Sequence, residues 1–93
     1  MIVAGIDVGA KNVHAVLIKD GELVARATVA SGFDHEESAE RGLAEAAAAA
    51  GVDRGDIDLV AATGAGRKAL PFAVPVAMST WVLLAWLVTR GAL

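Results

Sequence analysis

Residues 2–12 read Ile-Val-Ala-Gly-Ile-Asp-Val-Gly-Ala-Lys-Asn, an apolar run that leads directly into a glycine-containing turn. The unbroken apolar stretch Ile2–Ile6 is typical of a central β-strand that is covered on both faces. Asp7 and Gly9 mark its carboxyl end, because glycine adopts turn conformations without steric cost. We therefore predict a central strand at the start of the chain, followed at once by a tight turn.

Two further strands are predicted to follow in an antiparallel meander. Residues 12–18 are rich in β-branched side chains, and residues 23–30 alternate small apolar residues with Val24, Arg26 and Thr28. Between them lies Lys19-Asp20-Gly21-Glu22. An Asp-Gly pair between alternating strands favours a type I′ hairpin, whose positive φ angles suit glycine.

A helix and a fourth strand complete the predicted domain. Asp34 precedes an acidic first turn with Glu37 three residues later, an N-capping pattern, and Gly51 is placed to end the helix. The expected buried face of this helix consists of small apolar residues, namely Ala39, Leu43, Ala46, Ala47 and Ala50. Residues 57–63 form the next apolar strand, which a right-handed crossover makes parallel to its neighbour. The fold class is therefore α/β, with the order β-β-β-α-β and a mixed sheet.

Two glycine turns form the candidate functional site. Both follow predicted strands, and if those strands are neighbours the turns share one sheet edge, where open α/β sheets commonly bind ligands. Backbone amides in such turns form concave sites for phosphate, and a carboxylate beside them suits Mg²⁺ bound through water. Lysine and arginine add positive charge for an anion. The predicted residues are the catalytic and magnesium-binding Asp7 and the phosphate-binding Gly9, Ala10, Lys11, Thr63, Gly64, Gly66 and Arg67.

Each part of this pattern also has a plain structural explanation. An Asp-x-Gly turn often only connects two strands, Gly64 and Gly66 can simply end a strand, and Arg67 with Lys68 is typical of a solvated pair. The combination of both turns at one edge favours phosphate binding. The two histidines, His14 and His35, are expected at the surface.

Length, charge and composition exclude several classes of protein. A chain of 93 residues holds one small domain, and the absence of cysteine excludes a disulfide framework, a thiolate zinc site and a self-contained iron–sulfur cluster. A net charge of −3 gives no electrostatic footprint for nucleic acid. The first residues lack the basic segment of a secretory signal, so we expect a cytoplasmic protein.

The segments Gly5–Asn12, Ser31–Asp34 and Val60–Lys68 closely resemble the amino-terminal part of the BadF/BadG/BcrA/BcrD-type ATPases. These proteins are activators of 2-hydroxyacyl-CoA dehydratases and ATPase components of benzoyl-CoA reductases. The Asp-x-Gly turn alone is shared with the wider actin, sugar kinase and Hsp70 superfamily. Its combination with Ala-Thr-Gly-Ala-Gly-Arg at residues 62–67 narrows the resemblance to the activators.

Membership would imply a ribonuclease H-like fold that binds ATP and Mg²⁺ in a cleft between two such domains. Hydrolysis would then drive a low-potential electron to a partner dehydratase or reductase, and the intact homodimer would hold a [4Fe-4S] cluster through cysteines. On this pattern Asp7 and Gly9 match the phosphate-contacting turn, while Gly64, Gly66 and Arg67 match the second glycine segment. Many members carry Ser-Thr after the first turn and then a lysine, but this chain has Ala10, Lys11 and His14 there. The hydroxyl contacts to phosphate are thereby lost.

The resemblance covers residues 1–73, which we interpret as an incomplete ATPase domain that supplies at most half of a nucleotide site. As an isolated chain it is expected to be inactive. The alternative within the superfamily is the corresponding part of a sugar kinase, such as an N-acetylglucosamine kinase.

Residues 74–93 form an apolar tail in which Arg90 is the one charged residue. Residues 69–88 carry no charge and are long enough to span a hydrocarbon layer of about 30 Å, with the densest apolar run at residues 76–88. A non-catalytic, membrane-attached fragment is therefore an alternative from a different class. A shifted reading frame or a fragmentary gene call also explains the change in composition, and we interpret the tail as a non-native extension.

Overall fold

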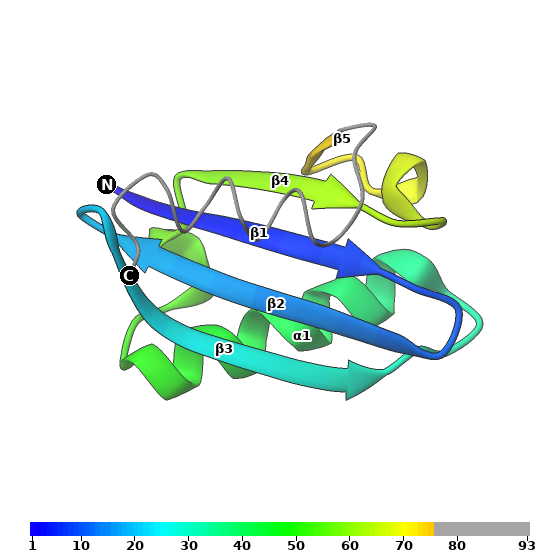
Figure 1. Cartoon of the computed structure of the whole chain (residues 1–93), viewed down its shortest axis with the longest axis horizontal. Helices are drawn as coiled ribbons and strands as arrows, with labels where there is room; N and C mark the ends of the chain where they lie inside the picture. Colours follow the sequence, from blue (N-terminus) through cyan, green and yellow to red (C-terminus); the bar gives the residue numbers. More distant parts are fainter. Residues whose placement is uncertain (76–93) are drawn as a thin grey trace.

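The computed structural model describes residues 1–75, and residues 76–93 lie outside the described part. Within residues 1–75 the chain forms a five-stranded sheet, one α-helix and two short 3-10 helices (Figure 1). In chain order the elements are β1 (Ile2–Val8), β2 (Asn12–Lys19), β3 (Glu22–Ala30), α1 (His35–Ala50), η1 (Arg54–Asp56), β4 (Leu59–Thr63), η2 (Arg67–Ala69) and β5 (Val74–Pro75). Of the expected apolar tail only its first two residues are described, and the candidate membrane segment 76–88 lies outside them.

The strands are ordered β3-β2-β1-β4-β5 across the sheet. β2 is antiparallel to both β1 and β3, whereas β4 is parallel to β1. The predicted α/β fold, with its mixed sheet and β-β-β-α-β order, is confirmed. The structure adds β5, which pairs in parallel with β4. The sequence analysis assigned these two residues to the tail, because the resemblance covers only residues 1–73.

The β2–β3 hairpin has the geometry predicted from its Asp-Gly pair. Asp20 has a φ of 51° and Gly21 a φ of 85°, and positive values at both central residues define a type I′ turn. The Asp20 carboxylate accepts a hydrogen bond of 2.9 Å from the Met1 ammonium group. This bond and the ammonium charge lower the pKa of Asp20 below its ordinary value of 3.8. The amino terminus is thus held at the sheet end opposite the candidate site.

Helix α1 begins and ends where the capping residues predict. Asp34 Oδ1 accepts hydrogen bonds from the Glu36 and Glu37 amides at 2.9 and 3.2 Å, and Gly51 ends the helix with a φ of 73°. The Glu37 carboxylate accepts a 2.7 Å bond from Arg41 Nε, one turn further along. No helix within residues 1–75 has the length and apolar character needed to cross a membrane.

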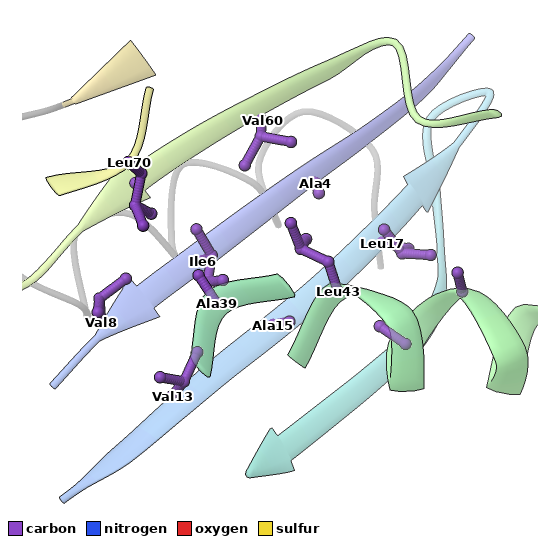
Figure 2. Close-up of a cluster of buried hydrophobic side chains, with 13 residues drawn as sticks. Ala4, Ile6, Val8, Val13, Ala15, Leu17, Ala39, Leu43, Val60 and Leu70 are labelled. Atoms are coloured by element: carbon purple, nitrogen blue, oxygen red, sulfur yellow. The ribbon is translucent and has the colours of Figure 1, made fainter. Parts of the chain in front are cut away.

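One face of α1 packs on the sheet and forms the core with it (Figure 2). Of the predicted buried face, Ala39, Leu43, Ala46 and Ala47 are buried and Ala50 is half-buried. Burial of a leucine side chain such as Leu43 stabilises a fold by about 2 to 3 kcal/mol. Gly42 also faces the sheet, where an added Cβ would lie 3.3 Å from Val13 Cγ1. Small residues therefore let the helix lie close to β1, β2 and β3.

Candidate functional site

The two glycine turns lie at the same edge of the sheet. β1 and β4 are adjacent parallel strands, so their carboxyl ends point the same way (Figure 1). Their register pairs Asp7 directly with Thr63. Asp7 is half-buried and Thr63 is 1 % exposed. The sequence-based expectation that these strands are neighbours is thus confirmed, and the last residues of both strands are brought together.

Gly64 lies directly against Asp7. Its φ of 93° is in the region that favours glycine. A Cβ at this position would overlap Asp7 Oδ1 and would lie 2.6 Å from the Val8 carbonyl oxygen. Both the backbone conformation and the close approach to the carboxylate therefore require glycine here.

Gly66 is a glycine for a different reason. It has a φ of −90°, which any residue adopts, and its amide donates a 3.1 Å hydrogen bond to the Val8 carbonyl oxygen. A Cβ at Gly66 would overlap the His35 ring and would lie 2.6 Å from Val8 Cγ1. The Gly66 amide is therefore committed to β1, and its missing side chain makes room for a histidine.

His35 is the site residue that the sequence analysis missed. We expected it at the surface, but it is half-buried, and its Nδ1 atom is fully buried with no hydrogen-bond partner within residues 1–75. The expectation was wrong because α1 begins beside the carboxyl end of β1, and the turn after β4 folds back over this helix end. Local sequence gives no signal for that long-range contact.

The first turn is held by its own hairpin and by Ser31. The Gly9 amide donates to the Asn12 carbonyl oxygen at 3.0 Å. Ser31 Oγ donates to the Gly9 carbonyl oxygen at 2.8 Å, and the Ser31 amide donates to the Lys11 carbonyl oxygen at 2.9 Å. Ala10 and Lys11 are both exposed.

The remaining predicted positions surround this centre. Arg67 is the first residue of η2, directly after the second turn, and the structure describes its backbone. Lys68 is exposed, as expected for a solvated residue. His14 pairs in register with Asp7 from β2 and is exposed as expected, with its Nδ1 atom 2.9 Å from Thr28 Oγ1.

Comparison with solved structures finds proteins whose sequence and fold are similar to those of this chain. The chain matches (R)-2-hydroxyglutaryl-CoA dehydratase component A of Acidaminococcus fermentans over 81% of its length, with 32% identity and a TM-score of 0.70. It matches the activator of 2-hydroxyisocaproyl-CoA dehydratase from Clostridium difficile, solved with bound ADPNP, over 81% of its length, with 33% identity and a TM-score of 0.68. The resemblance to the dehydratase activators is confirmed. The chain spans 29% and 28% of the lengths of these two proteins.

More distant structures share the fold of the dehydratase activators. A diol dehydratase-reactivating factor in nucleotide-free form matches 67% of this chain with 22% identity and a TM-score of 0.59, and the chain covers 12% of it. The ROK hexokinase of Thermus thermophilus matches 69% of this chain with 23% identity and a TM-score of 0.56, and the chain covers 22% of it. These similarities support the predicted superfamily fold alone. No protein-family profile and no curated protein sequence matches the chain.

The cofactors implied by the activator resemblance fit this chain unequally. Within residues 1–75 no group of three or more histidine, aspartate or glutamate side chains is arranged to hold a metal ion. Mg²⁺ does not need such a group, because it keeps several waters and binds one or two carboxylates together with phosphate oxygens. Asp7 fits that role. A [4Fe-4S] cluster does not fit these residues, because the chain has no cysteine.

Proposed function

We propose that this chain forms one side of the Mg²⁺–nucleotide site of an ATP-hydrolysing dehydratase activator. The observation that carries the proposal is the pairing of Asp7 with Thr63, which sets a carboxylate against the Gly64 backbone at the sheet edge. Ligands of open α/β sheets bind at such carboxyl edges. One activator of similar sequence binds the ATP analogue ADPNP.

Both turns would supply groups that bind phosphate. Because the Gly9 and Gly66 amides are bonded within the fold, these glycines would shape the turns. The amides of the exposed residues Ala10, Lys11 and Ala65 would then be the donors for phosphate oxygens. Lys11 adds a positive charge, and Arg67 adds a second from the start of η2. Mg²⁺ would supply neutralisation of phosphate charge, and Asp7 would hold it through water.

The full activity would require partners beyond this chain. We propose that ATP hydrolysis drives low-potential electron transfer to a 2-hydroxyacyl-CoA dehydratase or, alternatively, to a benzoyl-CoA reductase. The chain spans less than a third of the similar activators, so the other side of the nucleotide cleft and the cysteines for a [4Fe-4S] cluster in a homodimer would come from elsewhere. The dependence on ATP favours a cytoplasmic location.

A sugar kinase is the second candidate within the same superfamily. The ROK hexokinase and a xylulose kinase from Rhodospirillum rubrum each share 23% identity with the chain, against 32% and 33% for the two activators. The difference in identity favours the activator.

Titration of the 93-residue chain with Mg·ADPNP, followed by NMR, tests the phosphate site. We expect the amide signals of residues 9–11 and 63–66 to shift, and we expect Asp7→Asn to weaken binding about tenfold or more, because a charged hydrogen-bond acceptor is lost. Asp20→Asn makes the same chemical change at the opposite end of the sheet and is expected to leave binding unchanged. Equal affinity of Asp7→Asn and wild type, in a folded protein, would remove Asp7 from the site. Magnesium tripolyphosphate distinguishes phosphate recognition from contacts to the adenosine.

A further inference from the structure

Residues 31–35, which are the connection between β3 and α1 together with the first residue of the helix, touch both glycine turns. At its start Ser31 bonds to the carbonyl oxygens of Gly9 and Lys11 in the first turn. At its end the His35 ring lies against Gly66 in the second turn. One five-residue segment therefore contacts the two parts of the candidate phosphate site from the side of the helix.

Buried polar contacts fix this connection. Ser38 is fully buried, and its Oγ atom donates to the Asp34 carbonyl oxygen at 2.9 Å while accepting from the Gly32 amide at 2.8 Å. Arg41 Nη2 donates to the Ala30 carbonyl oxygen at 2.9 Å, which joins the end of β3 to the helix. Together with the Asp34 cap, these bonds join both ends of the connection to the first turns of α1.

The His35 ring is the contact between this fixed connection and the second turn. The ring fills the space that a Gly66 side chain would occupy, and its buried Nδ1 atom is on the side facing Gly66. Nδ1 has no hydrogen-bond partner within residues 1–75, so the ring holds the second turn by packing against it.

We propose that Ser31 and His35 are positioning residues that hold the two phosphate-binding turns at a fixed spacing. This inference rests on the proposed function, because it concerns the same phosphate site. Neither residue touches the nucleotide. Their effect on affinity comes from keeping the amides of both turns in the geometry that one phosphate chain requires, since small misplacements of binding groups cost affinity.

Binding of Mg·ADPNP by the 93-residue chain, measured by NMR titration alongside chemical denaturation, tests this role. We expect Ser31→Ala and His35→Ala each to weaken binding about threefold to fivefold, in the range of one lost neutral hydrogen bond or packing contact. Ser31→Thr keeps the hydroxyl group and is expected to bind as wild type does. Asp58→Ala is the matched control, because Asp58 Oδ2 accepts a 2.7 Å bond from the Ile2 amide at the opposite end of β1.

If Ser31 and His35 only stabilised the fold, all three alanine substitutions would lower the free energy of unfolding, and the three variants would bind Mg·ADPNP with equal affinity. Positioning predicts that Asp58→Ala loses stability alone, whereas Ser31→Ala shifts the Gly9 amide signal and His35→Ala shifts the Gly66 signal, both with weaker binding. Wild-type affinity in both Ser31→Ala and His35→Ala overturns the positioning role while leaving the phosphate site in place. If wild type binds no nucleotide and Asp7→Asn is indistinguishable from it, the proposed function itself fails.

Discussion

The two glycine turns follow neighbouring strands at one edge of the sheet, but different contacts hold each turn in place. The turn after β1 owes its shape to a local bond from the Gly9 amide to the Asn12 carbonyl oxygen three residues later, and Ser31 supports it from the end of β3. The turn after β4 is shaped by distant residues, because Gly64 lies against Asp7 and Gly66 lies against His35. The first turn thus follows from a hairpin, whereas the second depends on how β1, β4 and α1 pack together. Substitutions in the second turn should therefore lower the free energy of unfolding more than substitutions in the first turn.

Gly64→Ala is expected to have the largest effect. It combines an unfavourable φ of 93° with overlap on the Asp7 carboxylate and the Val8 carbonyl group, so we expect a loss of about 3 kcal/mol or more in the free energy of unfolding. Gly21→Ala is the control, because Gly21 has a φ of 85° and nothing within 4 Å of an added Cβ. Its expected cost is about 1 kcal/mol, from backbone strain alone. Equal costs in urea denaturation would show that the contact with Asp7 is unimportant.

Gly66→Ala should cost about 2 kcal/mol through its overlap with the His35 ring, since its φ of −90° adds no strain. In a His35→Ala background the overlap with the ring is gone and the contact with Val8 Cγ1 remains, so we expect a coupling energy of about 1 kcal/mol between the two positions. A double-mutant cycle from denaturation curves measures this quantity. If the losses of stability from the two single substitutions simply add in the double variant, the contact between His35 and Gly66 is contradicted.

Gly9→Ala is expected to cost about 1 kcal/mol, because a Cβ there would lie 2.9 Å from the Asn12 carbonyl oxygen but meets no distant residue. Its Gly64 and Gly66 amide signals should stay where they are in wild type. Gly55→Ala, which meets nothing within 4 Å, is the control and should be neutral or slightly stabilising. A cost for Gly9→Ala that equals that of Gly64→Ala would remove the distinction between the two turns.

Asp20, in the hairpin at the other end of the sheet, should give the smallest effect. Its pKa is lowered by the Met1 ammonium group, so the pair stabilises the fold above the ordinary carboxyl value of 3.8 and this contribution is lost as the pH falls below it. Both partners are exposed, so salt should screen the effect. We expect Asp20→Asn to melt slightly below wild type at pH 7, and we expect the difference to disappear as the pH falls through the lowered pKa of Asp20. A difference that persists in acid would contradict the ion pair.

Local rules predicted most of the fold. Asp20-Gly21 set the hairpin, and Asp34 and Gly51 set the ends of the helix, because each depends on its immediate neighbours. The crossover rule then made β4 parallel to β1, which brought Asp7 and Thr63 together. The two-residue strand β5 escaped prediction because it is too short to show a pattern.

The supporting contacts of the site could not be predicted from the sequence. Gly64 and Gly66 look alike in the motif, yet one is required by its φ angle and Asp7, and the other by His35. The sequence offered no reason to pair Ser31 with Gly9. These contacts join segments more than twenty residues apart, so they depend on the finished packing of helix and sheet.

The narrow spacing between α1 and the sheet limits how this protein can evolve. A larger residue at Gly42 or Ala46 would push α1 away from β2. His35 would move as well, because it is the first residue of this helix. A larger side chain in the buried layer would thereby disturb the edge with the two glycine turns, which lies about two to three helical turns away. Outward-facing positions such as Glu45 escape this restriction. Descendants of this sequence should therefore vary freely on the solvent side of the helix while keeping the inner side small.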